Sequence, residues 1–367
     1  MKPIRIFFPI FFLGIFSCFL FEEIFAQKEA NIWYFGKNAG IDFNSGLPVA
    51  LANGQIDTYE GTAAMSDRVT GQLLFYTDGI YVWDKNHNQM PNGFGLFGHF
   101  FSTSVLIVPQ PGSATLYYIF TTTADSCWSI SNSHTLHYSM VDMSLNGGLG
   151  DITTKNTLLL SPSCEKFAAV YQCNQTWFIA HEFNSNAFYA YKITSAGINA
   201  PVISYAGAVH QKSKGWMKIS PDGSKIALTV TSDFCSMTTS ILELFDFNSI
   251  TGKVSNAISL PADLCNYGIN FSPDNSKLYV AGFEMCSSED LFQYDLSSGI
   301  AATIVASKTW ISSGALFGAL QNAPDGKIYI AFDYSQYLGV INNPNAAGLA
   351  CNFVRNGFDL DPLVSGN

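Results

Sequence analysis

A short phrase recurs three times in the C-terminal half of the chain. It reads ISPDGSKIAL from Ile219, FSPDNSKLYV from Phe271 and NAPDGKIYI from Asn322. Proline sets φ at the second position of a tight turn, and aspartate can accept a hydrogen bond from the backbone two residues on. Glycine or asparagine then tolerates the left-handed conformation. Apolar and β-branched residues flank each turn, so the phrase predicts three β-hairpins.

The spacing of the phrase predicts a repeat architecture. Its prolines lie at positions 221, 273 and 324, which are 52 and 51 residues apart. A second pattern follows the phrase in each of the first two copies: a strand, an aspartate, a Ser/Asn/Gly turn and a final strand, as at 244–252 and 292–299. One unit therefore holds two hairpins, or four strands. Four-stranded units repeated radially form the blades of a β-propeller.

Weaker copies of both patterns extend the repeat towards the N-terminus. We predict an all-β, seven-bladed β-propeller of the WD40-like or YVTN-like kind, with four-stranded blades of about 50 residues. The first blade has room for three strands and lacks the innermost one. The predicted blades span residues 31–53, 56–97, 100–155, 164–207, 213–260, 265–306 and 315–360.

The composition agrees with this fold and excludes some partners. Aromatic residues make up 14% of the chain and charged residues only 13%, which suits strands better than solvated helices. No long apolar stripe of helical period follows residue 30. The net charge of −10 argues against nucleic acid as a partner.

Residues 1–26 have the order of a secretory signal peptide. Lys2 and Arg5 precede an apolar run over 6–21, and cleavage is predicted after Ala26. The alternatives are an uncleaved N-terminal anchor and a lipoprotein signal ending at Cys18. With cleavage after Ala26, the protein is secreted or displayed on the outer cell surface.

The propeller is predicted to occupy residues 27–360, which leaves only a short tail over 361–367. A closed propeller commonly completes its first blade with a strand from the other end of the chain. We therefore expect the sequence to be truncated before its closing strand, or the natural protein to continue further. The alternative is a ring that is closed only by packing.

Seven cysteines follow the predicted signal peptide, and none forms a C-x-x-C motif. Export would permit disulfides. The spacing of Cys164 and Cys173 favours a local bridge between the two strands of one hairpin. The odd count leaves at least one thiol free.

Several stretches resemble a known family. They are IWYFG and AGIDFNSG within 32–46, GQLLFYTDGIYVW at 71–83, VPQPG at 108–112 and HEFNSN at 181–186. The chain resembles the N-terminal propeller-like region of large surface proteins of the Bacteroidota. Those proteins carry PKD or other immunoglobulin-like modules downstream, and a C-terminal gliding-motility or type IX secretion signal. The resemblance implies export and a surface role, and it carries over no catalytic residue.

No catalytic, metal or cofactor motif stands out. His134 and His137 are three apart in a segment that alternates like a strand, so they would face opposite sides. The aspartates of the turns, Asp222, Asp274 and Asp325, are predicted to be structural. We therefore predict no cofactor, no metal site and no catalytic residue.

The loops entering the innermost strands of a propeller surround one mouth of its channel, where ligands commonly bind. Carboxylates, hydroxyls and aromatic rings at these positions would suit a sugar or a peptide, although the aromatic residues could instead wedge between blades. The candidate ligand-binding residues are Glu60, Thr62, Ser102, Thr103, Glu165, Lys214, Trp216, Tyr267 and Phe317.

These observations predict a monomeric, non-enzymatic module that recognises a protein or glycan at the extracellular surface. One alternative is a propeller enzyme acting on carbohydrate, such as a lyase, a lactonase or a quinoprotein-like dehydrogenase. The other is a scaffold that only presents downstream modules.

Overall fold

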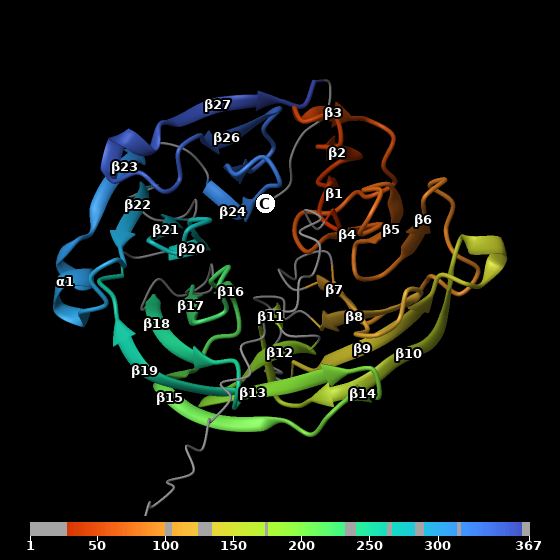
Figure 1. The fold of residues 1–367 in the computed structure, drawn as a ribbon, viewed down its shortest axis with the longest axis horizontal. Helices are drawn as coiled ribbons and strands as arrows, with labels where there is room; N and C mark the ends of the chain where they lie inside the picture. The colour runs from red at the N-terminus through yellow and green to blue at the C-terminus, as the bar shows by residue number, and fades with distance from the viewer. Residues whose placement is uncertain are drawn as a thin grey trace, which may run out of the picture.

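The structure is a computed structural model that describes residues 28–99, 105–123, 134–172, 175–231, 240–262, 266–282, 290–313 and 317–361. In these residues the strands form seven antiparallel sheets arranged around a central axis (Figure 1). The prediction of an all-β, seven-bladed β-propeller is confirmed. We number the blades in chain order.

Blades 1 to 3 follow one another along the chain, and each is a meander in which sequential strands pair. Blade 1 contains β1 (Ile32–Phe35), β2 (Ala39–Asp42) and β3 (Val49–Leu51). Blade 2 contains β4 (Ala63–Ser66), β5 (Leu73–Thr77) and β6 (Val82–Asp84). Blade 3 contains β7 (Val105–Pro109), β8 (Leu116–Thr122), β9 (Leu136–Asp142), the 3₁₀ helix η1 (Asn146–Gly148) and β10 (Asp151–Leu160).

Blade 4 contains β11 (Ser163–Gln172), β12 (Gln175–Glu182), β13 (Ser185–Thr194), β14 (Gly197–Ile198) and β15 (Val202–His210). Blade 5 contains β16 (Met217–Ile219), β17 (Lys225–Val230), β18 (Ile241–Asn248) and β19 (Lys253–Ser259). Blade 6 contains β20 (Asn266–Phe271), β21 (Lys277–Gly282), β22 (Asp290–Asp295), α1 (Ala301–Ala306) and β23 (Thr309–Ser313). Blade 7 contains β24 (Phe317–Asn322), β25 (Ile328–Phe332), β26 (Tyr337–Ile341), η2 (Gly348–Cys351) and β27 (Phe353–Asp359).

The recurring phrase forms the hairpin between the first two strands of blades 5, 6 and 7. Asp222 Oδ1 accepts a hydrogen bond from the Ser224 amide at 3.0 Å, and Asp274 and Asp325 make the same bond two residues on. The next turn position has positive φ: 67° at Gly223, 65° at Asn275 and 79° at Gly326. The structural role predicted for the three aspartates is confirmed.

The lysine of the phrase connects the two recurring sequence patterns. Lys225 forms an ion pair with Asp246 of the neighbouring strand β18. The Lys277 Nζ lies 3.2 Å from Asp295 Oδ1 in the equivalent place of blade 6. The two patterns therefore lie on adjacent strands of the same blade, joined by opposite charges.

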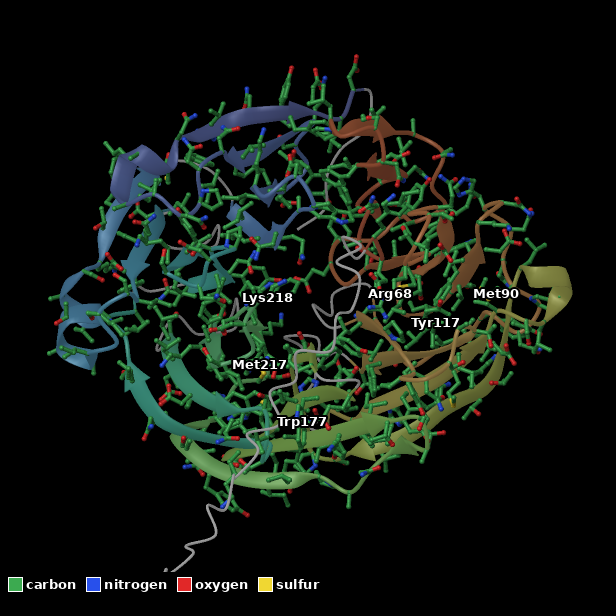
Figure 2. All side chains as sticks on the ribbon, in the orientation of Figure 1. Arg68, Met90, Tyr117, Trp177, Met217 and Lys218 are labelled. Carbon is green, nitrogen blue, oxygen red and sulfur yellow. The ribbon has the colours of Figure 1, made fainter. Side chains whose placement is uncertain are left out.

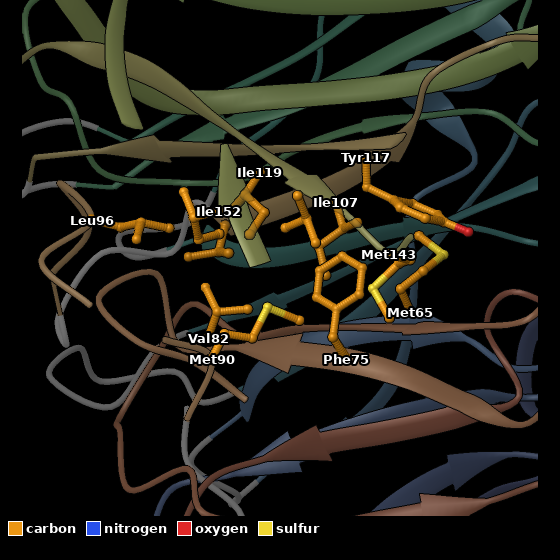
Figure 3. Close-up of a cluster of buried hydrophobic side chains, with 12 residues drawn as sticks. Met65, Phe75, Val82, Met90, Leu96, Ile107, Tyr117, Ile119, Met143 and Ile152 are labelled. Carbon is orange, nitrogen blue, oxygen red and sulfur yellow. The ribbon is translucent and has the colours of Figure 1, made fainter. Parts of the chain in front are cut away.

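Apolar side chains fill the spaces between neighbouring blades. Figure 3 shows the cluster between blades 2 and 3, in which Phe75 and Ile107 pack with methionines from both blades. Between blades 3 and 4, the rings of Phe120 and Phe178 stack with centroids 3.8 Å apart, and both side chains are fully buried. Each blade thus buries both of its faces, which is what holds the ring together.

Blade 1 has three strands, as predicted. Tyr34 of β1 stacks on Tyr76 of β5 at 4.6 Å, and Trp33 of β1 lies edge-on to Tyr329 of β25 at 5.8 Å. Both partners belong to the second strand of their blade. Strand β1 therefore lies at the same distance from the channel as the second strands of the neighbouring blades. No described strand fills the innermost position of blade 1.

Two blade boundaries differ from the prediction. Blade 6 was expected to end at residue 306, but residues 301–306 form helix α1 and the outermost strand follows at Thr309–Ser313. Blade 4 extends to His210 because both β14 and β15 pair with β13. In the described residues, three strands of blade 2 pair with one another, β4 to β6.

The predicted Cys164–Cys173 disulfide is wrong. Cys164 is a free, buried thiol. It follows Ser163, which pairs with Glu182 at one end of the β11–β12 hairpin, whereas Gln172 pairs with Gln175 at the other end. Cys173 itself lies outside the described residues, but a ten-residue strand separates the two ends of this hairpin.

The predicted signal peptide over 1–26 lies outside the described residues, as does the tail beyond residue 361. Among the helices that the structure describes, none is long and apolar enough to cross a membrane.

The stacking of Phe178 on Phe120 should be a major source of stability between blades. We expect Phe178→Ala to lower the free energy of unfolding by about 3–5 kcal/mol, because it leaves a cavity among fully buried rings. Urea unfolding followed by tryptophan fluorescence measures this. The control, Tyr205→Ala, truncates a ring that is 72% exposed and should change stability by less than about 0.5 kcal/mol. Equal losses in the two variants would contradict the packing described here.

Candidate ligand site in the central channel

The channel contains a cavity of about 590 Å³. It is lined by the innermost strands of blades 2 to 7 and by β1, so every blade contributes to it. Its polar lining includes Glu60, Thr62, Glu165, Lys218, Asn270 and Gln321.

Glu60 lies in the loop that leads into β4. The Tyr267 hydroxyl donates a hydrogen bond to Glu60 Oε1 at 2.9 Å. Burial, with a smaller contribution from the nearby Glu165 carboxylate, raises the pKa of Glu60 to about 8. The hydrogen bond from Tyr267 and the charge of Lys214 both act in the opposite direction. Glu60 is therefore mostly protonated at pH 7, which is unusual for a carboxyl group.

Tyr267 and Trp216 are held together by a buried threonine. Thr229 Oγ1 donates to the Tyr267 carbonyl at 2.7 Å and accepts from the Trp216 amide at 3.0 Å. The two rings meet edge to face at 6.3 Å. Gly215 lets the backbone before Trp216 lie close to Thr229, because a Cβ at that position would lie 2.1 Å from the Thr229 carbonyl oxygen. Blades 5 and 6 thus fix both rings beside Glu60.

Glu165 is fixed by contacts between blades 4 and 5. Its amide donates to Ser213 Oγ at 3.2 Å, and its side chain is almost fully buried. The neighbouring Lys166 donates its ammonium protons to the carbonyls of Lys212 at 3.1 Å and Ser213 at 2.6 Å. These bonds hold the loop that carries Lys214 against the start of β11, which brings a cation near the two carboxyl groups.

Lys218 occupies another part of the same cavity. Its Nζ donates to Gln321 Oε1 at 2.8 Å and lies 5.1 Å from the centre of the Trp216 ring. Burial lowers the pKa of Lys218 to about 8. Figure 2 places this side chain on the channel side of blade 5.

The structure gathers most of the predicted ligand-binding residues at the channel. Glu60, Thr62, Glu165 and Trp216 line the cavity, Tyr267 bonds to Glu60, and Lys214 acts on Glu60 electrostatically. Ser102 and Thr103 lie outside the described residues. Phe317 begins β24, but its side chain is outside the description. A ligand-binding role for these residues stays a prediction.

The polar residues of the cavity that the sequence did not bring out include Lys218, Asn270 and Gln321. Each stands three residues before the proline of the recurring phrase. The signal that could have identified them is this shared position, which a polar residue occupies in all three copies.

Comparison with known proteins supports the fold. No protein-family profile matches the chain, and no curated protein matches it in sequence. A candidate 6-phosphogluconolactonase from Bacteroides uniformis is similar in structure with a TM-score of 0.53 and 14% identity, covering 91% of this chain and 96% of its own. A candidate 6-phosphogluconolactonase from Bacteroides fragilis has a TM-score of 0.36, 11% identity and coverage of 84% and 96%. A quinoprotein alcohol dehydrogenase-like protein from Bacteroides thetaiotaomicron has a TM-score of 0.46, 10% identity and coverage of 93% and 79%.

These similarities correct one prediction. The chain was predicted not to be an enzyme, but it shares its fold with a protein named as a candidate lactonase, so the fold gives no ground for that exclusion. At such low identities the similarity establishes the propeller and not the reaction. The resemblance to Bacteroidota surface proteins is supported as far as the propeller fold.

The hydrogen bond from Tyr267 should lower the pKa of Glu60. We expect Tyr267→Phe to raise that pKa above its value of about 8, because the ionised carboxylate loses a donor. Carbon NMR of carboxyl-labelled protein measures the titration, with Glu60→Gln to assign the signal. The control, Tyr294→Phe, removes a hydroxyl that bonds to the Pro261 carbonyl and should leave Glu60 unchanged. A downward shift in Tyr267→Phe would contradict this geometry.

Proposed function

We propose that the protein is a hydrolase that cleaves a C–O bond in a carbohydrate held in the central channel, with Glu60 as the general acid and Glu165 as the general base. The observation that carries the proposal is the presence of these two carboxyl groups in one cavity, where Tyr267 hydrogen-bonds to Glu60. Two carboxyl groups in different environments are a common basis for acid–base catalysis.

The cavity suits a sugar in size and lining. A volume of about 590 Å³ is within the range of small-molecule sites. Trp216 offers an apolar ring face, and Thr62, Asn270 and Gln321 offer hydroxyl and amide groups that can bond to sugar hydroxyls. This mixture favours a polar ligand with apolar ring faces over a purely apolar one.

The environment of Glu60 assigns it the role of acid, and Glu165 takes the role of base as the second carboxyl group of the cavity. Glu60 is protonated at neutral pH and can give its proton to the leaving oxygen as the C–O bond breaks. Water supplies a hydroxyl to the carbon and its remaining proton to Glu165. The products are two hydroxyl-bearing groups, or a hydroxyl and a carboxyl group if the substrate is a lactone. Glu165 then releases its proton to solvent and Glu60 takes one up from solvent, which restores the starting state.

The expectation of a glycan ligand outside the cell belongs to the same proposal. A sugar substrate fits export by the signal peptide predicted over residues 1–26, and the name of the Bacteroides uniformis neighbour refers to an enzyme class that acts on sugars. That neighbour shares only the fold with this chain, so the proposal rests on the channel residues.

Glu60→Gln tests the proposed acid. We expect the protein to hydrolyse at least one member of a panel of sugar lactones and p-nitrophenyl glycosides. Glu60→Gln should lower kcat by about 100- to 10,000-fold, because the amide cannot give up a proton. The wild-type rate should fall as pH rises through about 8, where Glu60 loses its proton, and the variant should lack this limb.

Glu182→Gln is the matched control. Glu182 belongs to β12, is partly buried and accepts a hydrogen bond from the Tyr189 hydroxyl, but does not line the cavity. It should keep the wild-type rate and pH profile. Full activity in Glu60→Gln, or sugar binding with no turnover of any panel member, would contradict the catalytic proposal.

Export can be tested separately. In its native host, we expect the mature protein to begin at Gln27, because Ala26 is the predicted cleavage position. Mass spectrometry of the N-terminal peptide from the secreted or surface fraction measures this. Recovery of an intact N-terminus in the cytoplasmic fraction alone would contradict export.

A further inference from the structure

The three residues that stand three positions before the recurring proline form one polar corner of the cavity. Lys218, Asn270 and Gln321 lie on β16, β20 and β24, the innermost strands of consecutive blades. Lys218 and Gln321 meet through a hydrogen bond, and Asn270 holds the equivalent position on the strand of the blade between theirs. We call this group the inner polar corner.

Lys218 brings a positive charge into the corner. Its Nζ bonds to the neutral Gln321 side chain at 2.8 Å and faces the Trp216 ring at 5.1 Å. No ion pair joins it to an acidic residue in the part of the chain that the structure describes. By contrast, the turn lysines Lys225 and Lys277 both have aspartate partners.

Asn270 adds a buried donor for which the described residues provide no partner. The side chain is only 4% exposed, and its Oδ1 accepts a hydrogen bond from the Phe271 amide at 3.1 Å. That bond orients the amide and leaves Nδ2 as the free end. Among the described groups, Nδ2 has no hydrogen-bond partner. Buried N–H groups are rarely left unpaired, so this one indicates an acceptor supplied by a ligand.

We infer that the inner polar corner binds an oxyanion of the substrate, so that the sugar acted on in the channel is an anionic one, carrying a carboxylate or a phosphate. Lys218 supplies the charge and Asn270 Nδ2 supplies a directed hydrogen bond. This inference rests on the proposed function for the identity of the ligand as a sugar. Beyond the proposed function, the inference specifies that the sugar is negatively charged and that its charged group lies at Lys218.

The corner and Glu60 belong to one continuous set of contacts. Lys218 faces Trp216, the Trp216 ring meets Tyr267 at 6.3 Å, and Tyr267 bonds to Glu60. A sugar lying along Trp216 would thus present its anionic group to Lys218 and a reacting C–O bond to Glu60. The protonated state of Glu60 also removes one negative charge that would repel such a ligand.

Binding of matched probes tests the inference. Isothermal titration calorimetry of the full chain at pH 7 and fixed ionic strength would compare D-glucuronate, D-glucose 6-phosphate and neutral D-glucose. We expect at least one anionic sugar to bind about tenfold or more tightly than glucose. The tighter of the two anions identifies the group as carboxylate or phosphate. Equal affinity for glucose and both anions would overturn the inference.

Two variants locate the charge. Lys218→Met should remove about tenfold or more of the affinity for the anionic sugar and leave that for glucose unchanged. Gln321→Glu keeps the lysine but gives it a carboxylate partner, and should have the same effect. The control, Lys225→Met, removes the same charge from a turn of the same blade outside the cavity and should keep the preference. An equal loss in Lys225→Met, or full anion affinity in a folded Gln321→Glu, would overturn the inference.

The two proposals can fail separately. Turnover of neutral sugars without anion preference would overturn the oxyanion site and leave the hydrolase intact. Anion binding that depends on Lys218, with no turnover of any substrate, would support the oxyanion site and contradict the hydrolase.

Discussion

Burial of both faces of every blade is the constraint on which the rest of the structure depends. A sheet with two apolar faces needs a neighbour on each side, and seven such sheets satisfy one another only in a ring. The stacked pairs Phe120–Phe178 and Tyr34–Tyr76 show this packing between blades that follow each other in the chain. Trp33 and Tyr329 show it between the first blade and the last.

The ring explains how distant residues form one site. Glu60 and Tyr267 are 207 residues apart, yet both lie at the entrance to an innermost strand, and such positions meet around the channel. Buried polar contacts between blades then set their geometry. Thr229 ties Trp216 to Tyr267, and Lys166 ties the loop at 212–214 to the strand that carries Glu165. The site is therefore built between blades and depends on their packing.

Much of the fold could be predicted from the sequence because the features that define it depend on residues close together in the chain. The Pro-Asp-Gly turn needs only neighbouring residues, and its period revealed the blades. The outer edges of blades were harder, since residues 301–306 form a helix and not a strand for reasons that the repeat does not contain. The Cys164–Cys173 prediction failed because closeness in sequence was taken for closeness in space, whereas β11 keeps the two ends of its hairpin apart.

The candidate site, like the fold, could be predicted from the sequence only in part. The positions of Glu60, Glu165, Trp216 and Tyr267 followed from their places before or at the start of inner strands. The raised pKa of Glu60 could not be read from the sequence, because it depends on burial and on a glutamate from another blade. Lys218, Asn270 and Gln321 were overlooked because their strands read as core, although their shared distance from the proline marks them.

The central claim is that the channel holds a sugar with its anionic group at Lys218 and its reacting bond at Glu60. A crystal structure of the Glu60→Gln protein soaked with the anionic sugar that binds best would test this most directly. We predict density in the channel, with the carboxylate or phosphate in hydrogen-bonding distance of Lys218 Nζ and Asn270 Nδ2 and the sugar ring beside Trp216. A sugar bound outside the channel, or one whose anionic group lies away from Lys218, would contradict it.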